Sequence, residues 1–95
     1  MLLSPPFDQE NALVAPADVK RYIEDNLQCQ HLEVVGDGHH FEAVIVSEAF
    51  VGKSRVQRHQ LVYKALGDRM REEIHALSMQ TLTPQDWAQR QGGNG

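Results

Sequence analysis

The chain has 95 residues, of which 41% are hydrophobic and 23% charged, and its formal net charge is −4. This length allows one small core, so a multidomain enzyme with separate cofactor and substrate modules is excluded. No apolar run approaches the ~18 residues that a membrane span needs, and no basic residue precedes the apolar positions at the N-terminus, so we expect a cytosolic protein without membrane contact. The single cysteine, Cys29, excludes an internal disulfide and a self-contained zinc or iron–sulfur site, so any such cofactor would need ligands from elsewhere.

The first half of the chain predicts a helix and a β-hairpin. Residues 1–15 show no sustained hydrophobic period and contain several prolines, so we predict a flexible N-terminal extension. From Pro16 the apolar residues recur at helical spacing, which predicts an amphipathic helix over 16–27. Two runs with strand character follow, 31–35 and 41–46, and the glycines between them are typical of a tight turn.

The second half predicts helices and a third strand. Ser54 is a suitable N-cap for a helix over 55–66, and Gly67 suits its C-terminus. A charged stretch at 68–73 can add a short further helix. Polar and apolar residues then alternate over 75–82, as in a strand.

The end of the chain has the pattern of a helix start, with Thr83 as N-cap and Pro84 at the first helical position. Trp87 is expected to hold this helix against the core, and residues 92–95 are expected to be a disordered tail. The predicted order is αββαα(β)α. This is an α+β fold, in which a three-stranded sheet has its helices packed on one side.

The charge is unevenly distributed along the chain. Between Lys53 and Arg71 there are six Lys or Arg residues and one acid, so this stretch carries +5 and the rest of the chain −9. A basic stretch of this kind is typical of a surface that contacts phosphates or an acidic protein, and also of the solvated face of a helix.

The five histidines are the groups best suited to metal or proton chemistry near neutral pH. His39 and His40 lie in the hairpin loop and His75 begins the third strand, so folding could bring them together. Two or three imidazoles make an incomplete metal site, and the alternative is two solvated loop histidines beside a half-buried strand histidine. The sequence shows no catalytic triad motif, phosphate-binding loop or metalloprotease motif.

Four segments resemble the BolA family, and the GDGHHF turn at 36–41 is most similar to its IbaG branch. The other three are FVGKSRVQRHQLVY at 50–63, IHALS at 74–78 and TLTPQDW at 81–87. Each motif alone is weak, whereas four in the right order are a specific signal. The resemblance implies a class II KH-like αββααβ(α) two-layer sandwich, with the BolA-like domain over 16–91.

The resemblance also implies a partner and a shared cofactor. Members form heterodimers with monothiol glutaredoxins, either apo or bridged by a [2Fe–2S] cluster, in iron–sulfur cluster assembly, trafficking, or iron and stress sensing. His75 matches the strand-end ligand and His40 the loop ligand, with His39 as a substitute for His40. A glutaredoxin cysteine and a glutathione thiol would complete the four ligands, so the chain alone would hold no cofactor.

Two other functions stay open. A structural adaptor without a cofactor ranks second, and a DNA-binding transcriptional regulator that uses the basic, helix-turn-helix-like segment 53–71 ranks third. The resemblance also allows a homodimer and implies no enzymatic activity. The residues expected to contact a protein partner or DNA are Lys53, Arg55, Arg58, His59, Lys64 and Arg69.

Overall fold

The computed structural model describes residues 14–68, 74 and 76–92. Residues 69–73 of the expected further helix, 93–95 of the expected tail and most of the N-terminal extension lie outside these residues. Gly92 was expected in the disordered tail 92–95 but is the last residue of the last helix. The elements are α2 (Pro16–Asn26), β1 (His31–Gly36), β2 (His40–Val46), the short 3₁₀ helix η1 (Glu48–Phe50), α3 (Arg55–Leu66), β3 (Ala76–Leu82) and α5 (Pro84–Gly92).

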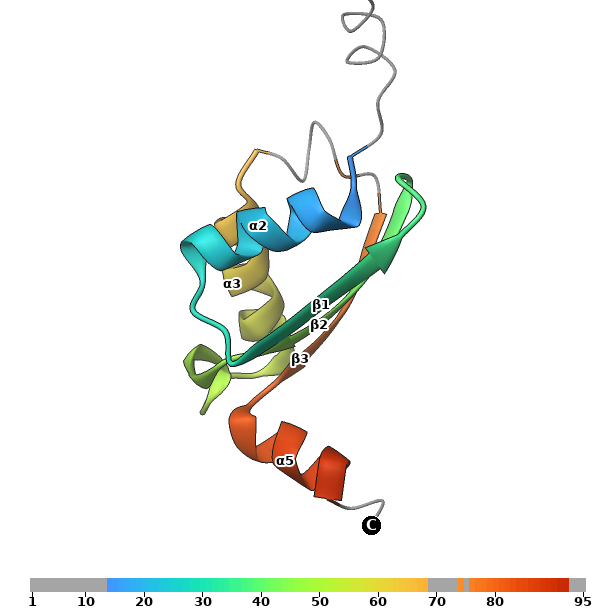
Figure 1. Ribbon diagram of the computed structural model, residues 1–95. Coiled ribbons are helices and arrows are strands. Elements are labelled where there is room, and N and C mark those ends of the chain that lie inside the picture. The colour runs from blue at the N-terminus through green and yellow to red at the C-terminus, as the bar shows by residue number, and fades with distance from the viewer. Residues whose placement is uncertain (1–13, 69–73, 75, 93–95) are drawn as a thin grey trace, which may run out of the picture.

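The strands form one sheet in the order β1-β2-β3, in which β1 and β2 are antiparallel and β2 and β3 are parallel. Parallel neighbours need a long crossover connection, and here the chain crosses from β2 to β3 through η1 and α3. Helices α2 and α3 lie on the same side of the sheet and pack against each other (Figure 1). The predicted α+β sandwich, with its three-stranded sheet and helices on one side, is confirmed.

The core lies between the sheet and these two helices. Alternate side chains of β2 face it, and Phe41, Ala43 and Ile45 are buried there. The helices contribute apolar residues at helical spacing, including Ile23 of α2 and Leu66 of α3, both fully buried. Each such large side chain contributes about 1.5–3 kcal/mol by leaving water. The helical spacing of apolar residues predicted for 16–27 agrees with the buried face of α2, where Val19 and Ile23 are buried.

Helix α5 lies apart from α2 and α3 (Figure 1). It continues from the end of β3 and extends away from the other two helices. Trp87 was expected to hold this helix against the core. Its indole instead stacks on the ring of His31, with the ring centroids 4.4 Å apart and an angle of 20° between the ring planes. Trp87 therefore attaches α5 to the first residue of β1. Within the described part of the chain, every helix is too short or too polar to span a membrane.

Candidate functional site

The turn between β1 and β2 brings His39 and His40 to one end of the sheet. The Asp37 carboxylate accepts hydrogen bonds from the backbone N–H groups of His39 and His40, each at 2.9 Å. The N–H of Asp37 donates to the carbonyl of His40 at 3.2 Å. The N–H of His40, followed by that of His39, lowers the pKa of the Asp37 carboxyl below its ordinary value. The backbone of this loop is therefore fixed by one carboxylate.

Glycine is needed on both sides of Asp37. At Gly36, a Cβ would collide with the carbonyl oxygen of His40 and would lie 2.7 Å from Cδ1 of Phe41. Gly38 has a φ of 99°, in the region that side chains disfavour. The Gly-Asp-Gly sequence thus fixes the position of the two histidines at this end of the sheet.

The structure brings two of the three predicted metal ligands to this place. The side chains of His39 and His40 are exposed, and His40 pairs with Ala76 across β2 and β3. His75 lies outside the described residues, so its proximity to His40 stays a prediction. Among the described residues, no three His, Cys, Asp or Glu side chains form a group that could hold a metal ion. A metal group bound here would need His75, ligands from another molecule, or both.

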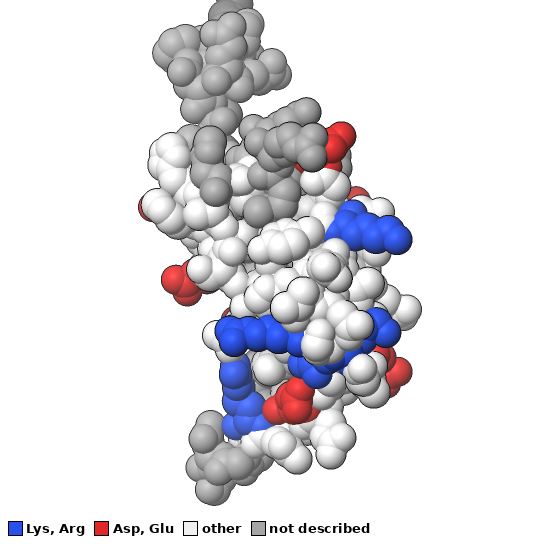
Figure 2. All heavy atoms as spheres, turned by 180° about the vertical axis from the view of Figure 1, so that it is seen from behind, with Lys and Arg blue, Asp and Glu red and all other residues white. Residues whose placement is uncertain are grey.

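The second predicted site lies along α3. Figure 2 shows Lys and Arg side chains gathered on one face of the molecule, with fewer acids among them. A groove of about 440 Å³ runs between the N-terminal half of α3 and the outer side of β3. Its cationic lining comes from the predicted residues Lys53, Arg55 and Arg58, and His59 lines it beside them. The structure thus gathers four of the six residues predicted for docking.

These four residues differ in how freely they can meet a partner. Lys53 and Arg55 are exposed, whereas the Arg58 side chain is 20% exposed and is held on three sides. It donates to the carbonyl oxygens of Lys53 at 3.0 Å and Thr81 at 2.9 Å, and its Nη1 lies 3.6 Å from a carboxylate oxygen of Asp86. Arg58 therefore connects α3, β3 and α5, and it adds positive charge to the groove from a fixed position.

His59 lines the groove but its ring contacts a neighbouring ring, and the remaining two predicted docking residues lie away from the groove or outside the described residues. His59 is half-buried and meets the ring of Tyr63 edge-on, with centroids 6.5 Å apart. Lys64 is exposed and lines a separate shallow pocket with Gly52 and Gln60. Arg69 lies outside the described residues.

The start of α5 lies beside Arg58, one of the residues that line the groove. Thr83 and Asp86 form a reciprocal cap: the Asp86 carboxylate accepts from the N–H of Thr83 at 3.2 Å, and the Thr83 hydroxyl accepts from the N–H of Asp86 at 3.0 Å. The Thr83 N–H, its hydroxyl and, to a lesser extent, Arg58 lower the pKa of Asp86. Asp86 therefore stays ionised beside Arg58 at neutral pH.

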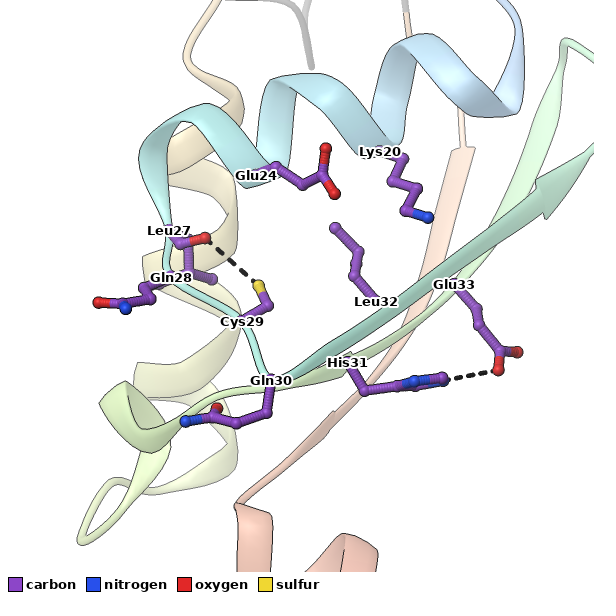
Figure 3. Close-up of a pocket in the computed structure, with 9 residues that line it drawn as sticks. All are labelled: Lys20, Glu24, Leu27, Gln28, Cys29, Gln30, His31, Leu32 and Glu33. Carbon is purple, nitrogen blue, oxygen red and sulfur yellow. Dashed lines mark hydrogen bonds and ion pairs between the residues drawn. The ribbon is translucent and has the colours of Figure 1, made fainter.

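Cys29 lies in a third pocket, between the end of α2 and the start of β1 (Figure 3). Its thiol donates to the carbonyl of Leu27 at 3.3 Å. Burial, with a smaller effect of Glu24, raises the pKa of this thiol, so the thiolate that a metal would bind is disfavoured. In Figure 3 the side chains of His31 and Glu33 point to the opposite side of β1 from Leu32.

Sequence reasoning missed the role of His31. The His31 Nε2 lies 2.6 Å from a carboxylate oxygen of Glu33, and the His31 ring stacks on the indole of Trp87. The i, i+2 spacing of His31 and Glu33 on a strand puts both on one face and could have indicated their contact. No local signal joins His31 to Trp87, which lies near the other end of the chain.

Fold and site together define a small α+β domain, with two exposed histidines at one end of its sheet and a groove with cationic lining beside β3. The family model described as "BolA-like protein" matches residues 15–86. The chain belongs to this family, so the resemblance predicted from its motifs is confirmed. Proteins of the family are regulators or partners rather than enzymes.

Two curated relatives show how widely the similarity extends. The acid stress protein IbaG of Escherichia coli K12 is 37% identical over 79 residues, which cover 82% of this chain and 94% of IbaG. The DNA-binding transcriptional regulator BolA of Vibrio cholerae is 35% identical over 81 residues, covering 75% of this chain and 76% of that protein.

Solved structures agree with the fold. A BolA homologue from Coxiella burnetii is 44% identical with a TM-score of 0.71, and the match covers 80% of this chain and 99% of that one. The BolA domain of SufE1 from Arabidopsis thaliana is 39% identical with a TM-score of 0.64, covering 74% of this chain and 92% of that one. A BolA domain is therefore also named as part of the protein SufE1.

Proposed function

We propose that this chain is a cytoplasmic partner of a monothiol glutaredoxin, with which it forms an apo heterodimer and a heterodimer bridged by a [2Fe–2S] cluster. Its role is iron–sulfur cluster assembly or trafficking, or the sensing of iron and stress. The proposal gives the chain a binding role and no catalytic one. The observation that carries it is the fixed loop that presents His39 and His40 at the end of β2, where His40 pairs with the residue that follows His75.

The donor set fits a shared cluster. His40 with His75 would supply two imidazoles, with His39 as the substitute loop ligand. The described thiol, Cys29, lies in another pocket with a raised pKa, so the thiolates would come from the partner cysteine and glutathione. Imidazole ligands leave less negative charge on iron than thiolates do, and they bind only when deprotonated. The cluster would therefore be labile, as transfer or sensing requires.

The test is anaerobic reconstitution of iron and sulfide on a monothiol glutaredoxin with glutathione, with and without this chain. We expect the chain to change the visible absorption and circular dichroism of the cluster. We expect His75→Ala to abolish that change, as should the double variant His39→Ala with His40→Ala, in which the substitute loop ligand is also removed. His31→Gln is the matched control, because His31 lies at the opposite end of β1 from the loop. An unchanged spectrum on adding the chain would refute the cluster role.

A homodimer and an apo adaptor remain alternatives within the same assay. Both predict complexes on size exclusion with no spectral change. If only such complexes form, the chain acts as an adaptor, and the two histidines have no ligand role.

A DNA-binding regulator is the second candidate, because the cations of α3 gather on one face and a relative carries that name. Binding to labelled duplex DNA should then weaken steeply as salt rises, since cations release counterions from the phosphates. Arg55→Ala should weaken binding, whereas His75→Ala should not. Arg58→Ala is a poorer probe, because Arg58 also joins three elements.

A further inference from the structure

We propose that the outer edge of β3, together with the cationic groove beside it, binds an extended acidic peptide segment of a partner protein as an added strand. The inference goes beyond the cluster role, because neither His40 nor iron takes part in it. It rests on the backbone groups that β3 leaves unpaired and on the charges that face them.

Strand β3 is at the edge of the sheet and pairs with β2 alone. The Leu82 carbonyl accepts from the N–H of Ser47, which follows β2, whereas the Thr81 carbonyl accepts from Arg58 on the other side. Because backbone groups alternate along a strand, Met79 directs its N–H and carbonyl to the same outer side as Thr81. Within the described part of the chain, no residue bonds to these outer groups of Met79.

The sequence of this edge lacks the usual protection against strand pairing. Residues 76–82 read ALSMQTL, with no charged residue and no proline. Edges of this kind are normally blunted by lysine, proline, a bulge or a covering element. The opposite edge, β1, has Glu33 in its middle. The two edges therefore differ, and β3 is the one suited to accept a strand.

The groove determines the chemistry of the occupant. Lys53, Arg55 and Arg58 line one wall, and residues 79–82 line the other. The nearest acid, Asp86, is already engaged by Thr83 and Arg58. A segment with alternating acidic side chains would place its carboxylates toward the cations while its backbone pairs with Met79.

A peptide fits this groove better than a nucleic acid. The outer edge offers both a donor and an acceptor at Met79, and a peptide backbone complements both, whereas phosphates supply acceptors only. Single-stranded nucleic acids also gain much of their affinity by stacking on aromatic rings. Among the described residues that line the groove, His59 has the one ring, and this ring contacts Tyr63.

The test uses the full-length chain and a fluorescein-labelled peptide of about eight residues in which glutamate and valine alternate. We expect saturable binding, with the largest amide shifts in nitrogen-15 spectra at Met79 and Thr81. A second peptide has the same charges but methylated backbone nitrogens on alternate residues, which prevents strand pairing. It should bind at least about tenfold more weakly.

Two matched charge reversals test the groove. Arg55→Glu should weaken peptide binding at least about tenfold, because Arg55 is an exposed cation of the groove wall. Lys20→Glu makes the same charge change on α2, away from this groove, and should change affinity less than about twofold. Met79→Pro removes an outward N–H that β2 does not use, and should abolish binding while the remaining spectrum stays folded.

Equal binding of the methylated peptide, or shifts that cluster away from β3, would overturn the proposal. So would duplex or single-stranded DNA that occupies the groove when the peptide does not. The assay contains no iron, glutathione or glutaredoxin, so its failure leaves the cluster proposal untouched, and failure of the cluster assay leaves this one untouched.

Discussion

The two ends of the sheet are held in different ways. At the histidine end, a backbone turn fixed by Asp37 and two glycines carries His39 and His40, whose side chains are exposed. At the α5 end, side chains connect elements far apart in the sequence. Arg58 joins α3 to β3 and α5, and Trp87 joins α5 to β1.

This difference matches the two tasks we propose. An imidazole that binds a cluster held by another protein must be able to rotate toward it, which an exposed ring allows. The fixed backbone keeps that ring at the same end of the sheet. A groove that selects an extended segment must keep its shape before binding, because ordering it on binding costs affinity. Substitutions at the first end should therefore act through the backbone, and those at the second through side-chain contacts.

The largest effect is expected at the histidine end, from Gly36→Ala. The new Cβ would collide with the His40 carbonyl and the ring of Phe41, so the hairpin must shift. We expect a loss of about 3 kcal/mol in urea denaturation, near the top of the range for overpacking. Gly52→Ala is the control: its φ of 78° is also positive, but nothing lies within 4 Å of the new Cβ. It should cost about 1–2 kcal/mol. Equal losses of stability for Gly36→Ala and Gly52→Ala would show that the contact of the new Cβ with His40 and Phe41 is unimportant.

Arg58→Met should have the next largest effect. It keeps an unbranched, flexible side chain but leaves the carbonyl of Thr81, a residue that is 8% exposed, without its donor. It also leaves Asp86 without its cation. We expect a loss of about 2 kcal/mol in the free energy of unfolding. Arg55→Met changes an exposed arginine one helical turn earlier and should change stability by less than about 0.5 kcal/mol. Similar losses for both would mean that Arg58 does not connect the elements.

Much of the fold could be predicted from the sequence because its signals are local. Ser54 is the N-cap and Gly67 the C-cap of α3, as predicted, and the strand predicted over 41–46 lies within β2. The third strand was predicted without its direction, and the structure shows that β3 is parallel to β2. The short helix η1 was not predicted, because three residues carry too weak a periodic signal.

The site was predicted less completely. Predicting a turn with His39 and His40 needed only local glycine chemistry, and the structure has His39 in the turn and His40 directly after it as the first residue of β2. Arg58 looked like one more surface cation, because its partner Thr81 lies 23 residues away and no spacing rule connects them. The stacking of Trp87 on His31 was missed for the same reason: Trp87 was expected to hold α5 against the core, and it instead holds α5 to the first residue of β1.

Trp87→Ala tests that stacking and should have a smaller effect. It removes the contact between α5 and His31, which is worth about 1 kcal/mol for a stacked pair. Because α5 extends from the end of β3, we expect the loss as faster amide exchange in α5, with exchange in the hairpin unchanged. Gln89→Ala, an exposed position on the same helix, is the control. Faster exchange in the hairpin as well would contradict the separation of the two ends.

The smallest effect is expected from acid titration of the two carboxylates, one at each end. The pKa values of Asp37 and Asp86 are both lowered in the folded chain, by the N–H groups of His40 and Thr83 respectively. Each therefore adds stability above its unfolded pKa of about 3.9, and this stability is lost as the pH falls through the lower folded value. Asp37→Asn keeps an oxygen acceptor but does not titrate, so stability should depend less on pH below about 4.

Amide spectra separate the ends: Asp37→Asn should remove the acid-induced shifts of His39 and His40 only, and Asp86→Asn those at the start of α5 only. If either variant removed both sets of shifts, the two ends of the sheet would be coupled. A ligand bound at the histidine loop would then also affect the groove.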